Sequence, residues 1–127
     1  MFDKKKSPPQ KRIDSLIGAG TTVHGDVTFS GGLRIDGAVH GKVATVDNEA
    51  ATLVVSEQAR VDGEVRVSHV VINGAVSGPV TARDYLELQA KARVNGDVEY
   101  RTLEMHVGAI VQGKLVAAIA EEATRRR

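Results

Sequence analysis

The chain has 127 residues, among them 17 Lys or Arg, 16 Asp or Glu and no Cys. That length has room for one domain, and the lack of cysteine excludes a disulfide framework and a thiolate metal site. The longest late apolar run, Leu115 to Ala120, is far too short to span a bilayer.

Residues 1–12 form a basic arm with five Lys or Arg, one Asp and two Pro. Few of them are apolar, so we expect this arm to be disordered. An apolar end beside a basic cluster predicts weak contact with an anionic membrane surface, which only an array of chains would make durable. The alternative is a merely solubilising tail. The residues expected to touch the membrane are Met1, Phe2, Lys4, Lys5 and Lys6.

The body of the chain, residues 13–115, repeats one eleven-residue frame six times. Each copy has Val at its seventh position and Gly at its ninth, and the copies start 16, 22, 15, 18 and 17 residues apart. Such self-similarity means that one supersecondary unit is stacked on itself. The copies are Ile17–Val27, Leu33–Val43, Val55–Val65, Val70–Val80, Leu88–Val98 and Met105–Leu115.

Within each copy the apolar residues fall on alternate positions and are rich in Val, which predicts short strands with one buried face. A repeat of about 17.6 residues on average fits one coil of a parallel β-helix with three short faces. Coils spaced about 4.8 Å apart would make a rod roughly 29 Å tall. We therefore expect an all-β, single-domain parallel β-helix of about six coils with disordered termini.

Three local features refine this expectation. The ninth-position Gly residues predict a sharp corner, and the fifth position, which is small in every copy, suits a narrow interior. The polar stretch 45–50 predicts an insertion that bulges from one corner. After Leu115 the repeat stops, so residues 116–127 are expected to form an end segment, with helical character over Val116–Ala123.

Chemically reactive groupings are scarce in the sequence. His24, His40 and Asp62 occupy the eighth position of successive copies. They predict an outward ladder, which is either a solvated polar column or, less in keeping with the rest of the chain, a metal patch. Neither a nucleophile elbow nor a phosphate-cradling Gly loop is present, so we expect no enzyme activity, no catalytic residue and no cofactor.

The ends of such a rod are the candidate functional surfaces. Each end of a β-helix exposes unpaired backbone groups and a hydrophobic cross-section, which favours edge-to-edge pairing. We expect coils to stack end to end so that the chain forms a homopolymer. The expected interface residues are Ile13, Leu16 and Ile17 in the first coil and Met105, Val107, Val111, Leu115, Val116 and Ile119 in the last.

The chain has Val-x-Gly-x-Val units, such as Val61-Asp62-Gly63-Glu64-Val65, within six expected coils and between two tails. In these features it resembles the bactofilins, a bacterial cytoskeletal family. The resemblance implies a right-handed, triangular β-helix whose ends join into nucleotide-independent filaments. It also implies attachment to the inner face of the cytoplasmic membrane through an N-terminal segment like residues 1–6. Scaffolding of cell-wall enzymes or cell-shape factors is implied as well. The last coil has no Phe where some relatives place an aromatic, and Leu115 and Ile119 would take its place.

Two other function classes remain open from the sequence. A hexapeptide-repeat acyltransferase also builds coils of about eighteen residues, but it places an apolar residue every six positions and needs a His at a trimer groove. A ligand-binding module would use the flat faces of the rod instead. The acidic body, with nine basic and thirteen acidic groups between residues 13 and 115, argues against a nucleic-acid partner.

Overall fold

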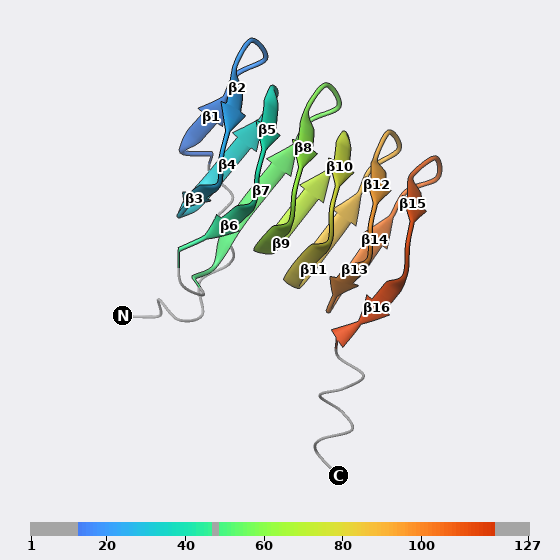
Figure 1. Ribbon diagram of the computed structural model, residues 1–127. Helices are drawn as coiled ribbons and strands as arrows, with labels where there is room; N and C mark the ends of the chain where they lie inside the picture. Colours follow the sequence, from blue (N-terminus) through green and yellow to red (C-terminus); the bar gives the residue numbers. More distant parts are fainter. Residues whose placement is uncertain (1–12, 47–48, 119–127) are drawn as a thin grey trace.

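The computed structural model describes residues 13–46 and 49–118, and these wind into a parallel β-helix (Figure 1). Its strands form two hydrogen-bonded sheets, one of ten strands and one of six. The strands are β1 (Ser15–Ile17), β2 (Thr22–His24), β3 (Val27–Phe29), β4 (Gly31–Ile35), β5 (Ala38–His40), β6 (Val43–Thr45), β7 (Ala51–Val55), β8 (Arg60–Asp62), β9 (Val65–Ile72), β10 (Ala75–Ser77), β11 (Val80–Leu88), β12 (Arg93–Asn95), β13 (Val98–Tyr100), β14 (Leu103–Met105), β15 (Ile110–Gln112) and β16 (Leu115–Ala117).

The two sheets make three faces, because the longest strands, β9 and β11, each continue around a corner. Face A contains β1, β4, β7, the second halves of β9 and β11, and β14. Face B is the six-stranded sheet β2, β5, β8, β10, β12 and β15. Face C contains β3, β6, the first halves of β9 and β11, β13 and β16. Three faces of six rungs each give six triangular coils, as the repeat predicted.

Successive coils lie in register along the valine column. On face B, Val23 pairs with Val39, Val39 with Val61, and the column continues through Val76 and Val94 to Val111. Every pairing on this face is parallel, so each valine rests on the valine of the coil before it. The alternating apolar pattern of the sequence therefore reports inward positions, as expected.

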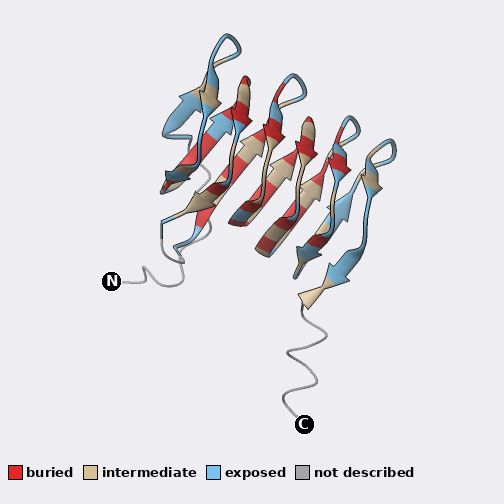
Figure 2. Cartoon of the chain, in the orientation of Figure 1, coloured by how far each residue is buried: buried red, intermediate tan, exposed pale blue. Residues whose placement is uncertain are grey.

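The core is a narrow column of aliphatic side chains that runs through the middle coils (Figure 2). Fully buried members include Ile35, Leu53, Ile72, Leu86 and Leu88. Small residues occupy the tight positions, and both Ala59 and Ala92 at the fifth position of the frame are buried. The expectation of a narrow interior at that position is confirmed.

The ninth-position glycines form the corner between faces B and C. A Cβ on Gly63 would overlap the backbone of Gly41, and the backbone φ of Gly63 is +158°. A side chain can also bond to the backbone at this corner. Asp26, which follows Gly25, accepts a hydrogen bond of 2.9 Å from the backbone N–H of Lys42 in the next coil. Pro79 lies at that position in the fourth coil and has no N–H to satisfy, which explains why proline is accepted there.

The uneven spacing of the repeats arises at the other corners. Between faces A and B some coils use four residues, closed by a hydrogen bond such as Ala59 N to Ser56 O at 2.9 Å. Other coils turn in two residues, Asp36–Gly37 and Asn73–Gly74. The longest spacing comes from the connection between β6 and β7, of which residues 47 and 48 lie outside the described part.

The expected end segment begins later than the sequence indicated. Val116 and Ala117 lie in β16, paired with Glu99 and Tyr100, so helical character from Val116 onward is wrong for these two residues. Each coil contributes a strand to face C, and Val116 and Ala117 belong to that strand in the last coil. The arm, residues 1–12, and Ile119 lie outside the described residues. In the part of the chain that is described, no helix is both long enough and apolar enough to cross a membrane.

Candidate assembly interface

Both ends of the rod present strands that are paired on one side only. Among the described residues, β1, β2 and β3 pair with the second coil alone, and β14, β15 and β16 pair with the fifth coil alone. Each outer edge therefore carries a row of backbone N–H and C=O groups without a strand partner. Such edges are templates for pairing with another chain.

The inward-facing apolar side chains of the first coil are more exposed than those of the second coil. Ile17, Val23 and Val27 are half-buried, whereas Ile35 and Val39, their register partners in the second coil, are fully buried. The residue type and the inward orientation are the same in both coils. The difference in burial comes only from the missing coil above.

The last coil shows the same loss on a larger scale (Figure 2). Met105 and Leu115 are each 43% exposed, whereas their partners Leu88 and Val98 in the fifth coil are 0% exposed. Val111 is half-buried above the almost fully buried Val94. These side chains form an apolar cross-section that another set of inward-facing residues would cover.

Other expected interface residues lie around the rim of these cross-sections. Leu16 is in register with the exposed Arg34, and Val116 with the exposed Glu99, so both side chains point away from the core axis. Val107 is 97% exposed at the four-residue corner of the last coil. Ile13 is also exposed and directly precedes the first coil.

One exposed apolar residue at this end was missed. Ile110 in β15 is in register with Arg93 and is exposed, although it lies outside the inward positions of the frame. Its signal in the sequence is a substitution in the column: the sixth position holds Arg60, Ala75 and Arg93 in the three coils before it. Ile110 therefore adds a large aliphatic side chain to an outward column that holds two Arg and one Ala in the three coils before it.

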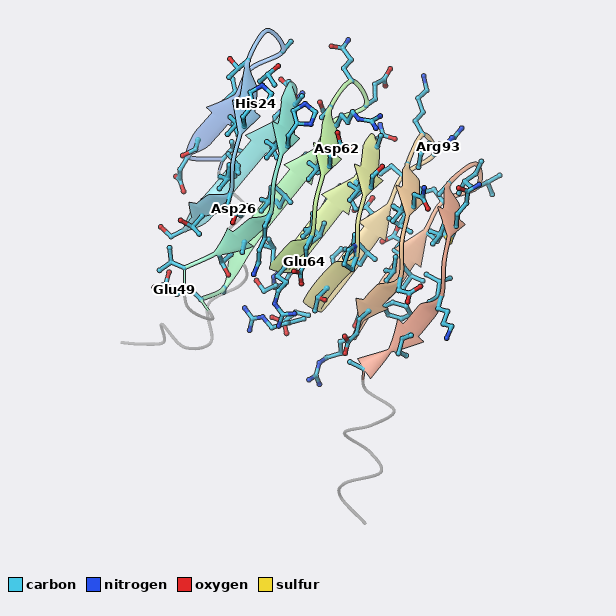
Figure 3. The ribbon with its side chains drawn as sticks, in the orientation of Figure 1. His24, Asp26, Glu49, Asp62, Glu64 and Arg93 are labelled. Carbon is cyan, nitrogen blue, oxygen red and sulfur yellow. The ribbon has the colours of Figure 1, made fainter. Side chains whose placement is uncertain are left out.

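The predicted ladder of His24, His40 and Asp62 is present on face B (Figure 3). The imidazoles of His24 and His40 stack with centroids 5.1 Å apart, and His40 Nδ1 lies 2.9 Å from Asp62 Oδ2. The Arg60 guanidinium is the first cause that lowers the pKa of Asp62, with His40 contributing less. Asp62 is thus already paired with Arg60 and His40, which favours a polar column over a metal patch.

Metal-ligating side chains converge instead on face A. Glu87, Glu104 and His106 bring one ligand atom each to within 4.8 Å of one another. The Tyr85 hydroxyl donates a hydrogen bond of 2.6 Å to Glu104, which raises the pKa of Tyr85 to about 12. A signal for this grouping is present in the sequence, because Glu87 and Glu104 each immediately precede a copy of the frame.

Comparisons with known proteins agree with this architecture. Residues 15–116 match the family described as "Bactofilin: Polymer-forming cytoskeletal". The chain is 28% identical over 102 residues to Bactofilin BacO of Myxococcus xanthus, covering 80% of this chain and 78% of that protein. It is 24% identical over 116 residues to Bactofilin BacP of the same organism, covering 91% of this chain and 47% of that protein. No solved structure matches the chain.

Proposed function

The chain belongs to the bactofilin family of polymer-forming cytoskeletal proteins, and from this premise we propose that its β-helices join through their ends into nucleotide-independent filaments. The observation that carries the proposal is the loss of cover at both ends of a continuous apolar column. Inward residues that are fully buried in the middle coils are partly exposed in the first and last coils. A neighbouring rod would restore the burial that the chain cannot complete alone.

The energetics favour such joining at the ends. Full burial of an aliphatic side chain contributes about 1.5–3 kcal/mol, and several half-exposed side chains lie at each end. Backbone hydrogen bonds between edge strands would add to this, at about 1 kcal/mol each. The sum opposes an association cost of about 4–15 kcal/mol, and the proposal is that the balance favours end joining at micromolar concentration. Among the described residues, every exposed large apolar side chain except Val46 lies in or beside the first or the last coil.

The role that fits a filament of this kind is structural. The sequence has no phosphate-cradling loop, and the inward residues of the coils are almost all aliphatic, so neither nucleotide hydrolysis nor another catalytic activity is part of the proposal. The filament would act as a scaffold that positions cell-wall enzymes or cell-shape factors. This part of the proposal rests on the family resemblance alone.

The proposed location is the inner face of the cytoplasmic membrane. Residues 1–12 carry five basic groups and one Asp, and Met1 and Phe2 supply an apolar end beside Lys4–Lys6. Each Lys near an anionic surface contributes about 1 kcal/mol. A filament presents many such arms at once, and multivalency would convert weak single contacts into durable attachment.

Sedimentation of the purified full chain at micromolar concentration, in physiological salt and without nucleotide, tests the end-joining proposal. The wild-type chain should pellet, and Leu115→Arg should remain in the supernatant because it places a charge in the terminal cross-section. Asn95→Arg is the matched control, since Asn95 is exposed on face B of the fifth coil and outside the terminal cross-section, and it should still pellet. A monomeric wild-type chain, or a Leu115→Arg variant that pellets like the wild type, would refute end joining.

A further inference from the structure

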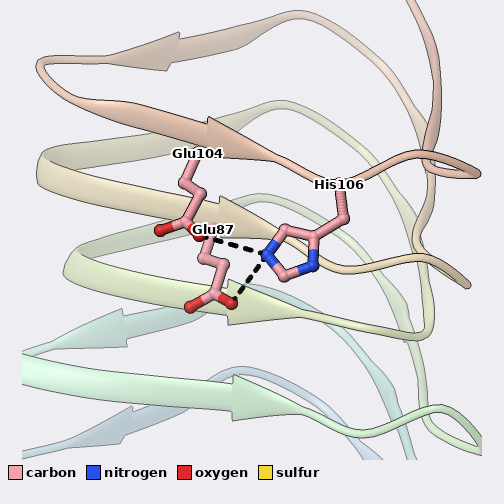
Figure 4. A group of neighbouring side chains, drawn as sticks. All are labelled: Glu87, Glu104 and His106. Atoms are coloured by element: carbon pink, nitrogen blue, oxygen red, sulfur yellow. Dashed lines mark ion pairs between the residues drawn. The ribbon is translucent and has the colours of Figure 1, made fainter.

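Three side chains at the end of face A converge on one point (Figure 4). Glu87 in β11 and Glu104 in β14 are direct register partners, so their carboxylates lie on the same outward column of adjacent coils. His106 follows β14 and turns its ring toward both. Its Nε2 atom is 3.1 Å from Glu87 Oε2 and 3.3 Å from Glu104 Oε2.

Neighbouring residues hold the two carboxylates in this orientation. Tyr85 donates its hydroxyl hydrogen to Glu104 Oε1 at 2.6 Å, which leaves Oε2 directed at the imidazole. The Gln89 amide donates to Glu87 Oε2 at 3.1 Å. Hydrogen bonds from a second layer of residues are a regular feature of metal sites, because they fix the ligands before the ion arrives.

The imidazole nitrogen itself lacks a hydrogen-bond partner. The His106 Nε2 atom is shielded from solvent and forms no hydrogen bond of regular geometry, although the side chain as a whole is 39% exposed and Nε2 lies beside the two carboxylate oxygens. A shielded nitrogen without a hydrogen bond is costly. A cation placed between the three ligand atoms would accept the nitrogen lone pair and both carboxylates at once.

We propose that Glu87, Glu104 and His106 bind a divalent transition-metal ion, with Zn²⁺ as the best fit and water completing the coordination. One imidazole nitrogen with two carboxylate oxygens is a donor set that Zn²⁺ accepts, whereas Mg²⁺ and Ca²⁺ prefer oxygen alone. Tetrahedral bonds of about 2.1 Å separate neighbouring ligand atoms by roughly 3.4 Å. The observed N–O separations of 3.1 and 3.3 Å are close to that value.

The position of this site gives the ion a structural role. It joins the fifth coil, through Glu87, to the sixth coil, through Glu104 and His106. Met105, whose side chain forms part of the exposed apolar end, lies between the two ligands of the sixth coil. A bound ion would therefore tie down the terminal coil, and an ion that binds only the folded chain also stabilises it.

Isothermal titration calorimetry of the full chain with ZnCl₂ tests the proposal, with MgCl₂ as the comparison ion. We expect one Zn²⁺ per chain and at least tenfold weaker binding of Mg²⁺. Glu104→Gln and His106→Asn should each weaken zinc binding at least tenfold, while His24→Gln on face B should not change it. Co²⁺ bound in place of Zn²⁺ should show the visible absorption of a tetrahedral site and lose it in His106→Asn.

Circular dichroism separates loss of the site from loss of the fold. If a ligand variant fails to fold, Tyr85→Phe provides a second test. It removes only the hydrogen bond that orients Glu104, and it should weaken zinc binding severalfold. The proposal is overturned if the wild-type chain binds no zinc. It is equally overturned if His106→Asn and Tyr85→Phe bind zinc as tightly as the wild type, or if His24→Gln abolishes binding. None of these outcomes depends on whether the chain forms filaments.

Discussion

The carbonyl oxygen of Gly25 occupies the space that a Cβ on Gly41 would need. The same relationship recurs up the rod, where Gly63 lies over Gly41 and Gly78 over Gly63. The corner between faces B and C thus brings the backbones of successive coils into contact with no room for a side chain. This close packing explains why glycine recurs at the ninth position of every copy of the frame.

Gly41→Ala should consequently destabilise the fold by about 2 kcal/mol or more, since the backbone of Gly25 and Asp26 in the preceding coil must move to admit the methyl group. No positive φ is involved at this residue, so the effect is purely steric. Gly20→Ala is the matched control, because nothing lies within 4 Å of its added Cβ. Urea unfolding followed by circular dichroism measures both. Equal midpoints for the two variants would contradict the close approach of the coils.

A second prediction concerns Ser68, the only buried polar side chain among the described residues. Its hydroxyl accepts a hydrogen bond from the N–H of Ala51 and donates one to the C=O of Ala51, both at 2.8 Å. Ser68→Ala should cost about 1–3 kcal/mol of stability, because both backbone groups lose their partner. Ser77→Ala on face B is the control and should change the free energy of unfolding by less than about 0.5 kcal/mol. If the two variants are equally stable, the hydroxyl bridge is not needed.

A third prediction is a pH dependence of stability that arises at His69. Burial is the main cause that lowers the pKa of His69, with Arg83 adding to it and Asp84 opposing it. The folded chain therefore resists the proton that the unfolded chain accepts near pH 6.5. The contribution of His69 to stability should be constant above that pH and should fall as the pH drops through it toward the lower pKa of the folded state.

His69→Asn should flatten this dependence between about pH 6.5 and the folded-state pKa, and thermal unfolding across that range measures it. His24→Asn, at an exposed position of face B, serves as the control and should retain the wild-type slope. Identical slopes for the wild type and His69→Asn would show that the dependence has another origin.

The basic arm gives a fourth prediction. A variant with Phe2→Ser and Lys4, Lys5 and Lys6 each changed to Gln should no longer sediment with phosphatidylserine liposomes, since it loses about 1 kcal/mol for each charge and the burial of the phenyl ring. Its filaments should persist in negative-stain electron microscopy, because the proposed end joining uses residues of the first and last coils and none of the four that are changed. Undiminished sedimentation with the liposomes would contradict membrane attachment through the arm.

Much of the fold could be predicted because each coil repeats the same constraints. The valine column specifies inward positions, the glycine column specifies a corner, and both are visible without any structure. The ladder of His24, His40 and Asp62 followed from the same frame, and its residues are indeed adjacent. A solenoid is favourable for such reasoning, since each coil contacts only its neighbours.

The parts that could not be predicted lie where the frame is interrupted. Whether a corner between faces A and B takes two residues or four depends on backbone geometry that alternating hydrophobicity does not encode. Leu16 and Val116 are apolar, so residue type alone suggests inward positions, but they alternate with Ile17 and Leu115 and their register places them on the outward parity. Glu87, Glu104 and His106 flank the frame on either side of its first position. Glu87 and Glu104 share a frame position and are register partners, but the frame does not encode the direction of the His106 ring at the start of the corner.

The central claim, that rods join through their ends, predicts the orientation of strands within a filament. X-ray fibre diffraction of aligned filaments of the full chain tests it most directly. End-joined rods should give a reflection near 4.8 Å along the filament axis and a subunit repeat of roughly 29 Å or a multiple of it. A 4.8 Å reflection perpendicular to the axis would mean that rods associate side by side, and it would contradict the account.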